Sequence, residues 1–296
     1  MMDIWLNRLV ILTAIVFGIF LYRKLCPSQK EHFSQKSPFI LRQDNAIYDP
    51  FYIEYYDDLH ATDSYCEDDF HFIKETTNPV AESSVFLDIG CGTGKLLRKM
   101  EDNGYTAFGV DKSKSMGEAC KHKVDCNDVL IDPMLYDNKT FTHITCTHFT
   151  IYEMEKKETF FRHCYLWLQC GGYLIVHLVD PEKYTKVTPS IVDDISMSMS
   201  TSMVTKTNLE YLDYAYRSEY KQKETNYLFT ETFTDRYTEN VRQNQSTLYM
   251  SEPKQTILDL ATRCGFVLYR ETTYNKKIKD PHQYLVVFVK PMCGDI

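Results

Sequence analysis

The sequence lacks a basic stripe, and its charge balance is acidic. Its 296 residues include 33 Lys and Arg against 41 Asp and Glu, which gives a formal net charge of −8 at pH 7. Residues 1–30 are the exception, because four basic residues there accompany Asp3 alone. Binding to nucleic acids depends on clustered Lys and Arg that neutralise phosphates. The absence of such a cluster therefore disfavours a DNA or RNA partner.

The sequence also lacks the cysteine spacings of metal sites. Ten cysteines are present, but none form a CxxC pair and no Cys and His array has the spacing of a zinc site. Several stand among apolar neighbours, where a free thiol packs as a small apolar side chain. This pattern is typical of a reducing compartment, and we predict neither disulfides nor a structural metal.

An apolar stretch lies at the N-terminus. Residues 9–22 (LVILTAIVFGIFLY) carry no charge, and with their apolar flanks they approach the ~20 residues that a helix needs to cross hydrocarbon. No small-residue cleavage site follows, which favours an uncleaved anchor over a signal peptide; a buried core helix is the third alternative. Because the positive charges lie mainly after the stretch, the positive-inside rule places the bulk of the protein in the cytosol. We expect a single-pass membrane anchor over residues 1–26.

A glycine-rich turn lies between a short apolar run and an expected helix in residues 85–100 (VFLDIGCGTGKLLRKM). In such a unit the glycines let the backbone approach a ligand closely, and the first N–H groups of the helix point at the ligand. The spacing is Asp-x-Gly-x-Gly-x-Gly, which differs from the GxGxxG pattern of nicotinamide and flavin enzymes. A nicotinamide oxidoreductase is therefore the disfavoured alternative.

This motif resembles the first motif of the class I S-adenosylmethionine-dependent methyltransferases. The resemblance extends over residues 80–290 in the order of elements, and it implies S-adenosylmethionine as the cofactor. The residues that it assigns to cofactor binding in the turn are Asp88, Gly90, Cys91, Gly92 and Gly94.

Two further carboxylates are candidates for cofactor contacts. Asp111 ends the second expected strand, 105–110, where a carboxylate is suited to accept both ribose hydroxyl protons. By the resemblance, Asp128 at the edge of the third expected strand, 127–131, contacts the adenine amino group. Asp132 is the competing candidate for that contact.

The alternation of elements predicts an α/β fold. We expect a Rossmann-like, mostly parallel sheet of seven strands with an antiparallel last strand, in a methyltransferase domain over residues 47–296 that follows a mobile polar tether over residues 27–46. The other expected elements are helices over 68–74, 112–120, 155–168 (ended by Gly171 and Gly172) and 251–264, and strands over 141–147, 173–179, 266–270 and 284–289.

Residues 181–250 interrupt that alternation. Residues 190–207 are rich in Ser, Thr and Met and predict a mobile loop. Three alternating runs then predict an antiparallel β insert, and the resemblance implies that this insert covers the substrate. The runs are 210–220, 227–233 and 241–250.

Tyr52 and Tyr56 are candidates for contact with the substrate. They lie four residues apart, and therefore on one face if residues 46–59 form a helix. The resemblance implies that such a helix caps the cofactor and substrate pocket. Simple aromatic packing is the alternative.

Three residues are further candidates on the acceptor side. His148 follows the fourth expected strand, at the edge where ligands of open α/β sheets collect, and Tyr152 is near it. His148 is the candidate general base, with a structural histidine as the alternative. Arg242 in the insert is a candidate for substrate contact, with a solvated position as the alternative.

We expect a membrane-anchored methyltransferase that acts on a small or lipophilic acceptor. The leaving group of a sulfonium is already activated, so the protein mainly aligns the nucleophile with the methyl group. Such alignment lowers the activation barrier by ~7–11 kcal/mol. Oxygen, nitrogen and carbon acceptors are all served by this fold. The alternative is a catalytically idle, membrane-tethered domain that binds the cofactor or a partner as a scaffold.

Overall fold

The computed structural model describes most of the chain beyond residue 36. The described residues are 37–183, 206–211, 213–224, 226–274, 278 and 280–294, with Arg8 and Thr13. The chain divides into two compact units, 1–36 and 37–296, and all elements below belong to the second. Within the described ranges no helix is long and apolar enough to cross a membrane. The predicted anchor over residues 1–26 falls outside those ranges, apart from Arg8 and Thr13.

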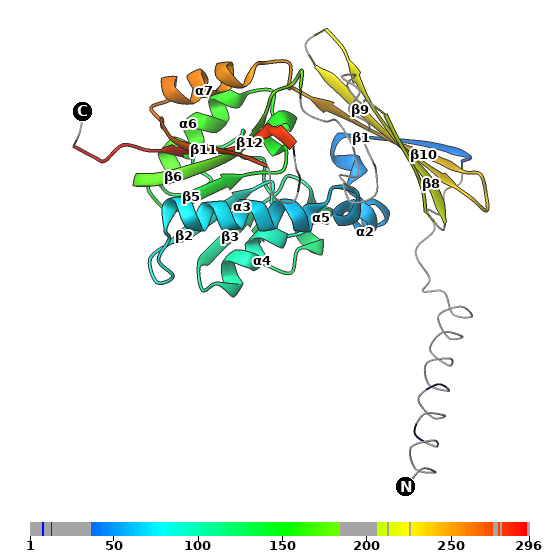
Figure 1. Ribbon diagram of the computed structural model, residues 1–296, viewed down its shortest axis with the longest axis horizontal. Coiled ribbons are helices and arrows are strands. Elements are labelled where there is room, and N and C mark those ends of the chain that lie inside the picture. Colours follow the sequence, from blue (N-terminus) through cyan, green and yellow to red (C-terminus); the bar gives the residue numbers. More distant parts are fainter. Residues whose placement is uncertain are drawn as a thin grey trace. The chain divides into compact units, whose positions relative to one another are not determined.

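A seven-stranded sheet forms the centre of the second unit (Figure 1), in the order β11-β12-β6-β5-β2-β3-β4. Its strands are β2 (Val85–Ile89), β3 (Thr106–Val110), β4 (Val124–Asp125), β5 (Phe141–Cys146), β6 (Leu168–Val179), β11 (Val267–Tyr274) and β12 (Asp280–Val289). β2 to β6 pair in parallel, and β12 is antiparallel to both β6 and β11. The predicted seven-stranded, mostly parallel sheet with an antiparallel last strand is confirmed.

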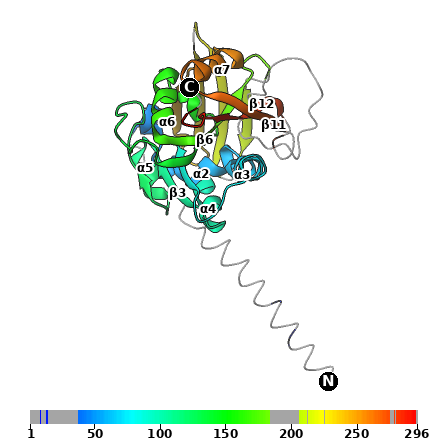
Figure 2. The ribbon, with the colours of Figure 1, turned by 90° about the vertical axis from the view of Figure 1, so that its left-hand side faces the viewer.

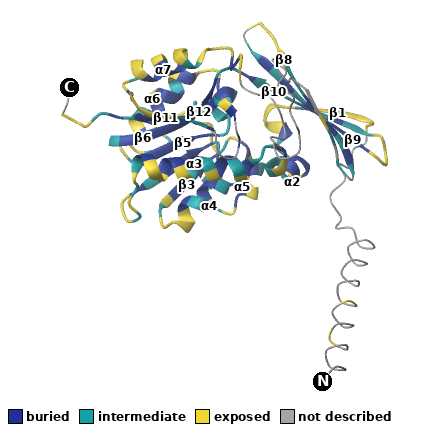
Figure 3. Ribbon diagram, viewed as in Figure 1, coloured by how far each residue is buried: buried dark blue, intermediate teal, exposed yellow. Residues whose placement is uncertain are grey.

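Helices cover both faces of this sheet because its strands are apolar on both sides. Leu174 and Val176 of β6 pack with α6 and α7, whereas Ile175 between them packs with α3 and α4. Figure 2 shows the two helix layers from the side, and Figure 3 shows the sheet buried between them. The helices are α3 (Thr62–Thr77), α4 (Lys95–Asp102), α5 (Lys114–Ala119), α6 (Lys157–Trp167) and α7 (Lys254–Arg263).

A second sheet of five strands has the order β1-β10-β9-β8-β7. Its strands are β1 (Phe39–Gln43), β7 (Lys206–Glu210), β8 (Tyr214–Gln222), β9 (Tyr227–Asp235) and β10 (Val241–Leu248). β7 to β10 pair in antiparallel fashion, as predicted for the insert. The predicted mobile loop over 190–207 lies outside the described residues up to residue 205.

The segment between β1 and α3 joins the second sheet to the first. Residues 44–47 form the 3-10 helix η1 (Asp44–Ile47), and the helix α2 (Pro50–Leu59) follows. The Phe51 ring of α2 packs edge-on against Phe233 of β9, with 5.4 Å between the ring centroids. The predicted helix that carries Tyr52 and Tyr56 is therefore present.

Three expected elements differ from the structure. Residues 39–46, expected at the end of a mobile tether, form β1 and most of η1, because β1 pairs in parallel with β10 about two hundred residues later. The expected strand over 127–131 is wrong: the strand at this edge is the two-residue β4, and a turn over 129–131 lies where the strand was expected. Gly171 and Gly172 lie within β6 rather than at the end of α6, which ends at Trp167.

Cys170 and Cys293 form a disulfide, with their Cα atoms 5.5 Å apart. The prediction that the chain has no disulfide is therefore wrong. Antiparallel pairing of β6 with β12 brings the two cysteines together: the Gly171 N–H donates to the Lys290 carbonyl, and the Lys290 N–H donates to the Gly172 carbonyl. The pairing spans 123 residues of sequence, so cysteine spacing does not indicate it.

Candidate functional site

The glycine turn after β2 is held in a conformation that favours glycine. Gly90 has φ of +72°, and a Cβ added there would lie 2.4 Å from the Thr150 side chain. Asp88, at the end of β2, is buried and accepts a 2.6 Å hydrogen bond from the Thr145 hydroxyl. Burial raises the pKa of Asp88 to about 7. The hydrogen bond from Thr145 thus fixes Asp88 between neighbouring strands, directly before the glycine turn.

Asp111 connects the end of β3 to this turn. One carboxylate oxygen accepts the Gly92 N–H at 3.0 Å, and the other accepts the Ser113 N–H at 2.8 Å. Burial raises the pKa of Asp111, and the two backbone donors oppose that shift. The carboxylate therefore lies directly beside the glycine turn.

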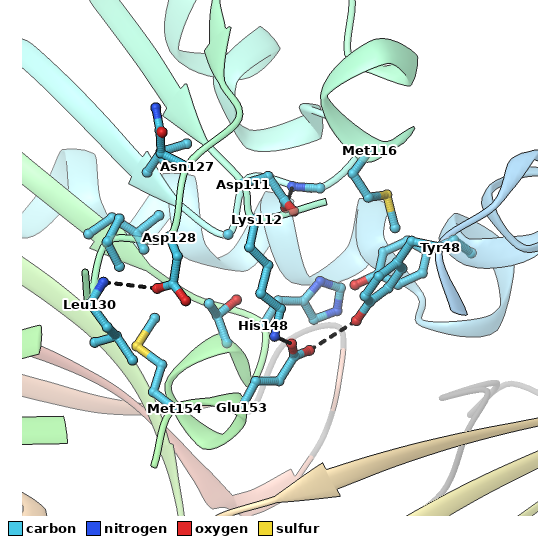
Figure 4. A pocket seen from close by; sticks show the side chains of 17 residues that line it. Tyr48, Asp111, Lys112, Met116, Asn127, Asp128, Leu130, His148, Glu153 and Met154 are labelled. Atoms are coloured by element: carbon cyan, nitrogen blue, oxygen red, sulfur yellow. Dashed lines mark hydrogen bonds and ion pairs between the residues drawn. The ribbon is translucent and has the colours of Figure 1, made fainter. Parts of the chain in front are cut away.

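A pocket lies beside Asp111, and side chains from several segments line it (Figure 4). Six predicted site residues are among those that line it: Tyr56, Gly90, Gly92, Asp111, Asp128 and His148. The pocket is not lined by Asp88, Cys91 or Gly94. Cys91 is buried, and Gly94 is the N-cap of α4. The structure does not bring Tyr52, Tyr152 or Arg242 to this pocket.

A carboxylate bridge that the sequence did not predict crosses the pocket (Figure 4). Glu153 accepts the Tyr48 hydroxyl at 3.1 Å and lies 2.8 Å from the Lys112 ammonium. Burial opposes the charged form of Lys112, but the Glu153 carboxylate outweighs it and raises the pKa of Lys112. The sequence signal that was present is the position of Lys112, directly after Asp111. Glu153 and Tyr48 carry no comparable local signal.

His148 lies at the end of the pocket that Tyr48 and Tyr56 also line (Figure 4). Its Nε2 lies 3.0 Å from the carbonyl oxygen of His60. A carbonyl only accepts, so Nε2 carries the proton and Nδ1 carries the lone pair. Burial lowers the pKa of His148 to about 4. The imidazole is thus neutral at pH 7 and is able to accept a proton.

The other predicted residues have partners elsewhere. The Tyr152 hydroxyl is buried and accepts the Val179 N–H at 2.8 Å, which ties the residue to β6. Arg242 is buried and binds Asp49 and the Ile47 carbonyl rather than facing solvent. Within the described ranges, no group of three His, Cys, Asp or Glu side chains is arranged to hold a metal ion.

Comparison with known proteins assigns the central segment. Residues 87–176 match the family model described as a methyltransferase domain. This protein carries a methyltransferase domain. It is therefore an enzyme of that class with S-adenosylmethionine as its cofactor, and the expectation of this cofactor is confirmed. The match favours this assignment over a catalytically idle domain. No curated protein matches the chain.

Solved methyltransferases share the fold of this methyltransferase. An S-adenosylmethionine-dependent methyltransferase from Clostridium acetobutylicum ATCC 824 is 17% identical, with a TM-score of 0.60 over 80% of this chain and 97% of that one. The CcbJ methyltransferase from Streptomyces caelestis is 13% identical, with a TM-score of 0.64 over 84% of this chain and 99% of that one. At these identities the likeness concerns the fold.

The backbone and charge of the pocket lining suit S-adenosylmethionine. At Gly90 the backbone faces Thr150 too closely for a side chain, so this stretch of the turn presents bare backbone to the pocket. The pocket lining has more carboxylates than ammonium groups: Asp111, Asp128 and Glu153 against Lys112. This excess of negative charge suits a positively charged sulfonium. The bound cofactor supplies an activated methyl group.

Proposed function

We propose that this methyltransferase transfers a methyl group to a small or lipophilic acceptor that enters beside Tyr56 and His148. The observation that carries the proposal is the hydrogen bond from the Gly92 N–H to Asp111, which sets a carboxylate against the glycine turn. Asp111 would bind the ribose hydroxyls, and the turn would contact the amino-acid part of the cofactor.

The adenine would lie on the far side of Asp111, between Asp128 and Leu130. Both residues line the pocket, and Asp128 accepts the Leu130 N–H at 2.9 Å, which fixes that carboxylate. Asp132, the competing candidate, does not line the pocket and instead accepts the Met134 N–H. This placement leaves the end of the pocket at Tyr56 and His148 for the methyl group and the acceptor.

His148 would act as general base for an acceptor that must lose a proton. Its Nε2–H is held by the His60 carbonyl, so the imidazole is in one tautomer before any substrate arrives. A neutral base of this kind contributes typically 10²–10⁴-fold where the reaction needs proton removal.

Two neighbours in fold support a small-molecule acceptor. KedS8 from Streptoalloteichus sp ATCC 53650 is described as a sugar N-methyltransferase, and CalS10 from Micromonospora echinaspora as an amino pentose methyltransferase. The lipophilic option rests on the apolar residues 9–22, which we propose to anchor the enzyme in a membrane with its catalytic domain in the cytosol.

Calorimetry with S-adenosylmethionine tests the cofactor site. We expect Asp111→Ala to weaken binding by at least ~10-fold, because it removes a charged hydrogen-bond acceptor worth ~1.5–3 kcal/mol. Asp128→Ala is expected to weaken binding, whereas the matched variant Asp132→Ala is expected to leave it unchanged. Unaltered binding by Asp111→Ala would contradict the proposed site.

Fractionation of cells tests the proposed localisation. The full chain is expected in the membrane fraction, resistant to a carbonate wash, and the 37–296 unit in the supernatant. Recovery of the full chain in the supernatant would contradict the anchor.

A further inference from the structure

A buried carboxylate of the second sheet lies at the start of a chain of hydrogen bonds. Glu231 on β9 is 1% exposed, and its two carboxylate oxygens accept hydroxyls from opposite directions. Oε2 accepts the Tyr52 hydroxyl at 2.5 Å, and Oε1 accepts the Tyr216 hydroxyl at 2.8 Å. The Tyr52 oxygen also lies 2.9 Å from Nε2 of His60. A chain of hydrogen bonds thus runs from Glu231 on β9 through Tyr52 to His60, the residue that follows α2.

The direction of each hydrogen bond follows from the number of protons available. A phenol has one proton, and Tyr52 donates it to Glu231, so its oxygen must accept from His60. The proton of His60 therefore lies on Nε2, and Nδ1 carries the lone pair. A base that is oriented by a second group, which a third group orients in turn, is the arrangement that activates proton transfer in hydrolytic triads.

His60 lies next to the acceptor end of the pocket. Its ring packs on Tyr56, with 4.4 Å between the centroids, and Tyr56 lines the pocket. The His148 ring is 6.4 Å away, and the His60 carbonyl holds the Nε2–H of that ring. Both imidazoles therefore have their proton on Nε2 and a free lone pair on Nδ1.

The protonation states suit transfer from imidazole to carboxylate. Burial lowers the pKa of His60 to about 3, with a smaller contribution from His148, so His60 is neutral at pH 7. Burial raises the pKa of Glu231 to about 7, against its hydrogen bonds from Tyr52, Tyr216 and Asn244 and the charge of Arg242, so this carboxylate accepts a proton near neutral pH. Glu231 therefore suits the role of final proton acceptor.

We propose that Glu231 and Tyr52 position His60, in place of His148, as the proton acceptor for the methyl acceptor, which is therefore a protic nucleophile, an amine or a hydroxyl. The inference rests on the proposed function. The nucleophile gives its proton to Nδ1 of His60, Nε2–H passes to the Tyr52 oxygen, and the Tyr52 proton passes to Glu231. The nucleophile's lone pair forms the new bond to the methyl carbon, and the electron pair of the broken carbon–sulfur bond stays on sulfur. One positive charge on the sulfonium and one negative charge on Glu231 are thereby neutralised together.

Two ligands that differ at the methyl position test this relay of Glu231, Tyr52 and His60. Sinefungin carries an amine on a carbon that replaces the sulfonium and its methyl, whereas S-adenosylhomocysteine has nothing there. We expect Tyr52→Phe and Glu231→Gln each to weaken the binding of sinefungin by ~10-fold, because a hydrogen bond to a charged group contributes ~1.5–3 kcal/mol. Both variants are expected to bind S-adenosylhomocysteine within about two-fold of the wild type, since their cofactor pocket is unaltered.

Tyr216→Phe is the matched control, because it removes the other hydroxyl from the same carboxylate without touching His60. It is expected to leave the ratio of the two affinities unchanged. An equal effect of Tyr216→Phe and Tyr52→Phe would assign the result to packing around Glu231 and overturn the relay. A parallel change for both ligands, or no change for either, would also overturn it.

Nitrogen-15 spectra of the histidine rings give a readout that is independent of turnover. In the wild type, His60 is expected to show its proton on Nε2, and Tyr52→Phe is expected to shift part of the population to Nδ1. An unaltered tautomer in Tyr52→Phe would contradict the relay while leaving cofactor binding intact. Failure of the wild type to bind either ligand would instead contradict the proposed function.

Discussion

Replacement of Asp49 is expected to destabilise the protein through the buried guanidinium of Arg242. Nη1 of Arg242 donates to both Asp49 oxygens, at 2.8 and 2.7 Å, and Nη2 donates to the Ile47 carbonyl at 2.8 Å. The Arg242 side chain is 3% exposed and that of Asp49 is 29% exposed. Without Asp49, the positive charge stays buried and loses its counter-ion.

The magnitude follows from two separate roles of Asp49. Breaking a buried ion pair from one side costs ~3–5 kcal/mol, and the lower end applies because water reaches Asp49. Asp49 is also the N-cap of α2, where its side chain accepts the Tyr52 N–H at 3.1 Å. Asparagine keeps such a cap and alanine loses it, at a further cost of ~1 kcal/mol. We therefore expect losses of about 3 kcal/mol for Asp49→Asn and about 4 kcal/mol for Asp49→Ala.

Thermal and urea unfolding at pH 7 measure these losses. For a domain of this size, the Asp49→Asn loss corresponds to a fall of about 6–12 °C in Tm. Glu54→Gln, an exposed change on the same helix, is the control and is expected to stay within ~0.5 kcal/mol of the wild type. A loss below ~1 kcal/mol for Asp49→Asn would refute the reasoning about the buried charge. Equal losses for Asn and Ala would refute the role of the cap.

Two further predictions concern the glycine turn. Gly90→Ala is expected to lower the free energy of unfolding by ~1–2 kcal/mol for its positive φ and by ~1–3 kcal/mol for the clash with Thr150. It is also expected to weaken the binding of S-adenosylmethionine, as measured by calorimetry. Gly104→Ala, also at positive φ but 3.5 Å from its nearest neighbour, is the control that should keep full binding. For Asp88, burial raises the folded pKa to about 7, above the unfolded value of about 4. Its stabilising contribution is therefore complete below pH ~4 and is lost as the pH rises to ~7, so the stability of the wild type relative to Asp88→Asn should fall over that range in urea titrations. A constant or rising difference would contradict this assignment.

The main sheet was predictable because its signals are local. A short apolar run, a turn and an amphipathic run identify each strand and helix without knowledge of what they contact. β1 gave no such signal, because Phe39–Gln43 becomes a strand only by pairing with β10. The prediction of no disulfide failed for the same reason, since the Cys170–Cys293 bond depends on the antiparallel pairing of β6 with β12. β4 has only two residues, which is too short for a periodic pattern.

The same distinction applies to the site. Gly90, Gly92 and Asp111 belong to one strand–turn–helix unit and its successor, so their spacing alone placed them together. Glu153 reaches the pocket from the segment after β5, and its role depends on Tyr48, which lies more than one hundred residues earlier. Tyr152 was expected at the pocket because it lies near His148 in the sequence, but its hydroxyl accepts the Val179 N–H instead.

Glu231 shows where the sequence held a signal that periodicity did not use. β9 alternates strictly, and its buried face consists of Tyr227, Phe229, Glu231, Phe233 and Asp235. Two acids on an otherwise aromatic face violate the expected pattern, because a buried carboxylate costs free energy unless it is hydrogen-bonded. Asp235 has a structural reason, since it accepts the N–H groups of Tyr237 and Thr238 at the turn that follows.

Glu231 has no such backbone partner. Its oxygens accept phenol hydroxyls, one of which leads to His60 beside the pocket. A buried acid that violates the local pattern and has one partner leading toward the cofactor pocket is a candidate for a chemical role. The period-2 pattern of β9 therefore identifies its own exception, and that exception is the residue on which the sinefungin comparison depends.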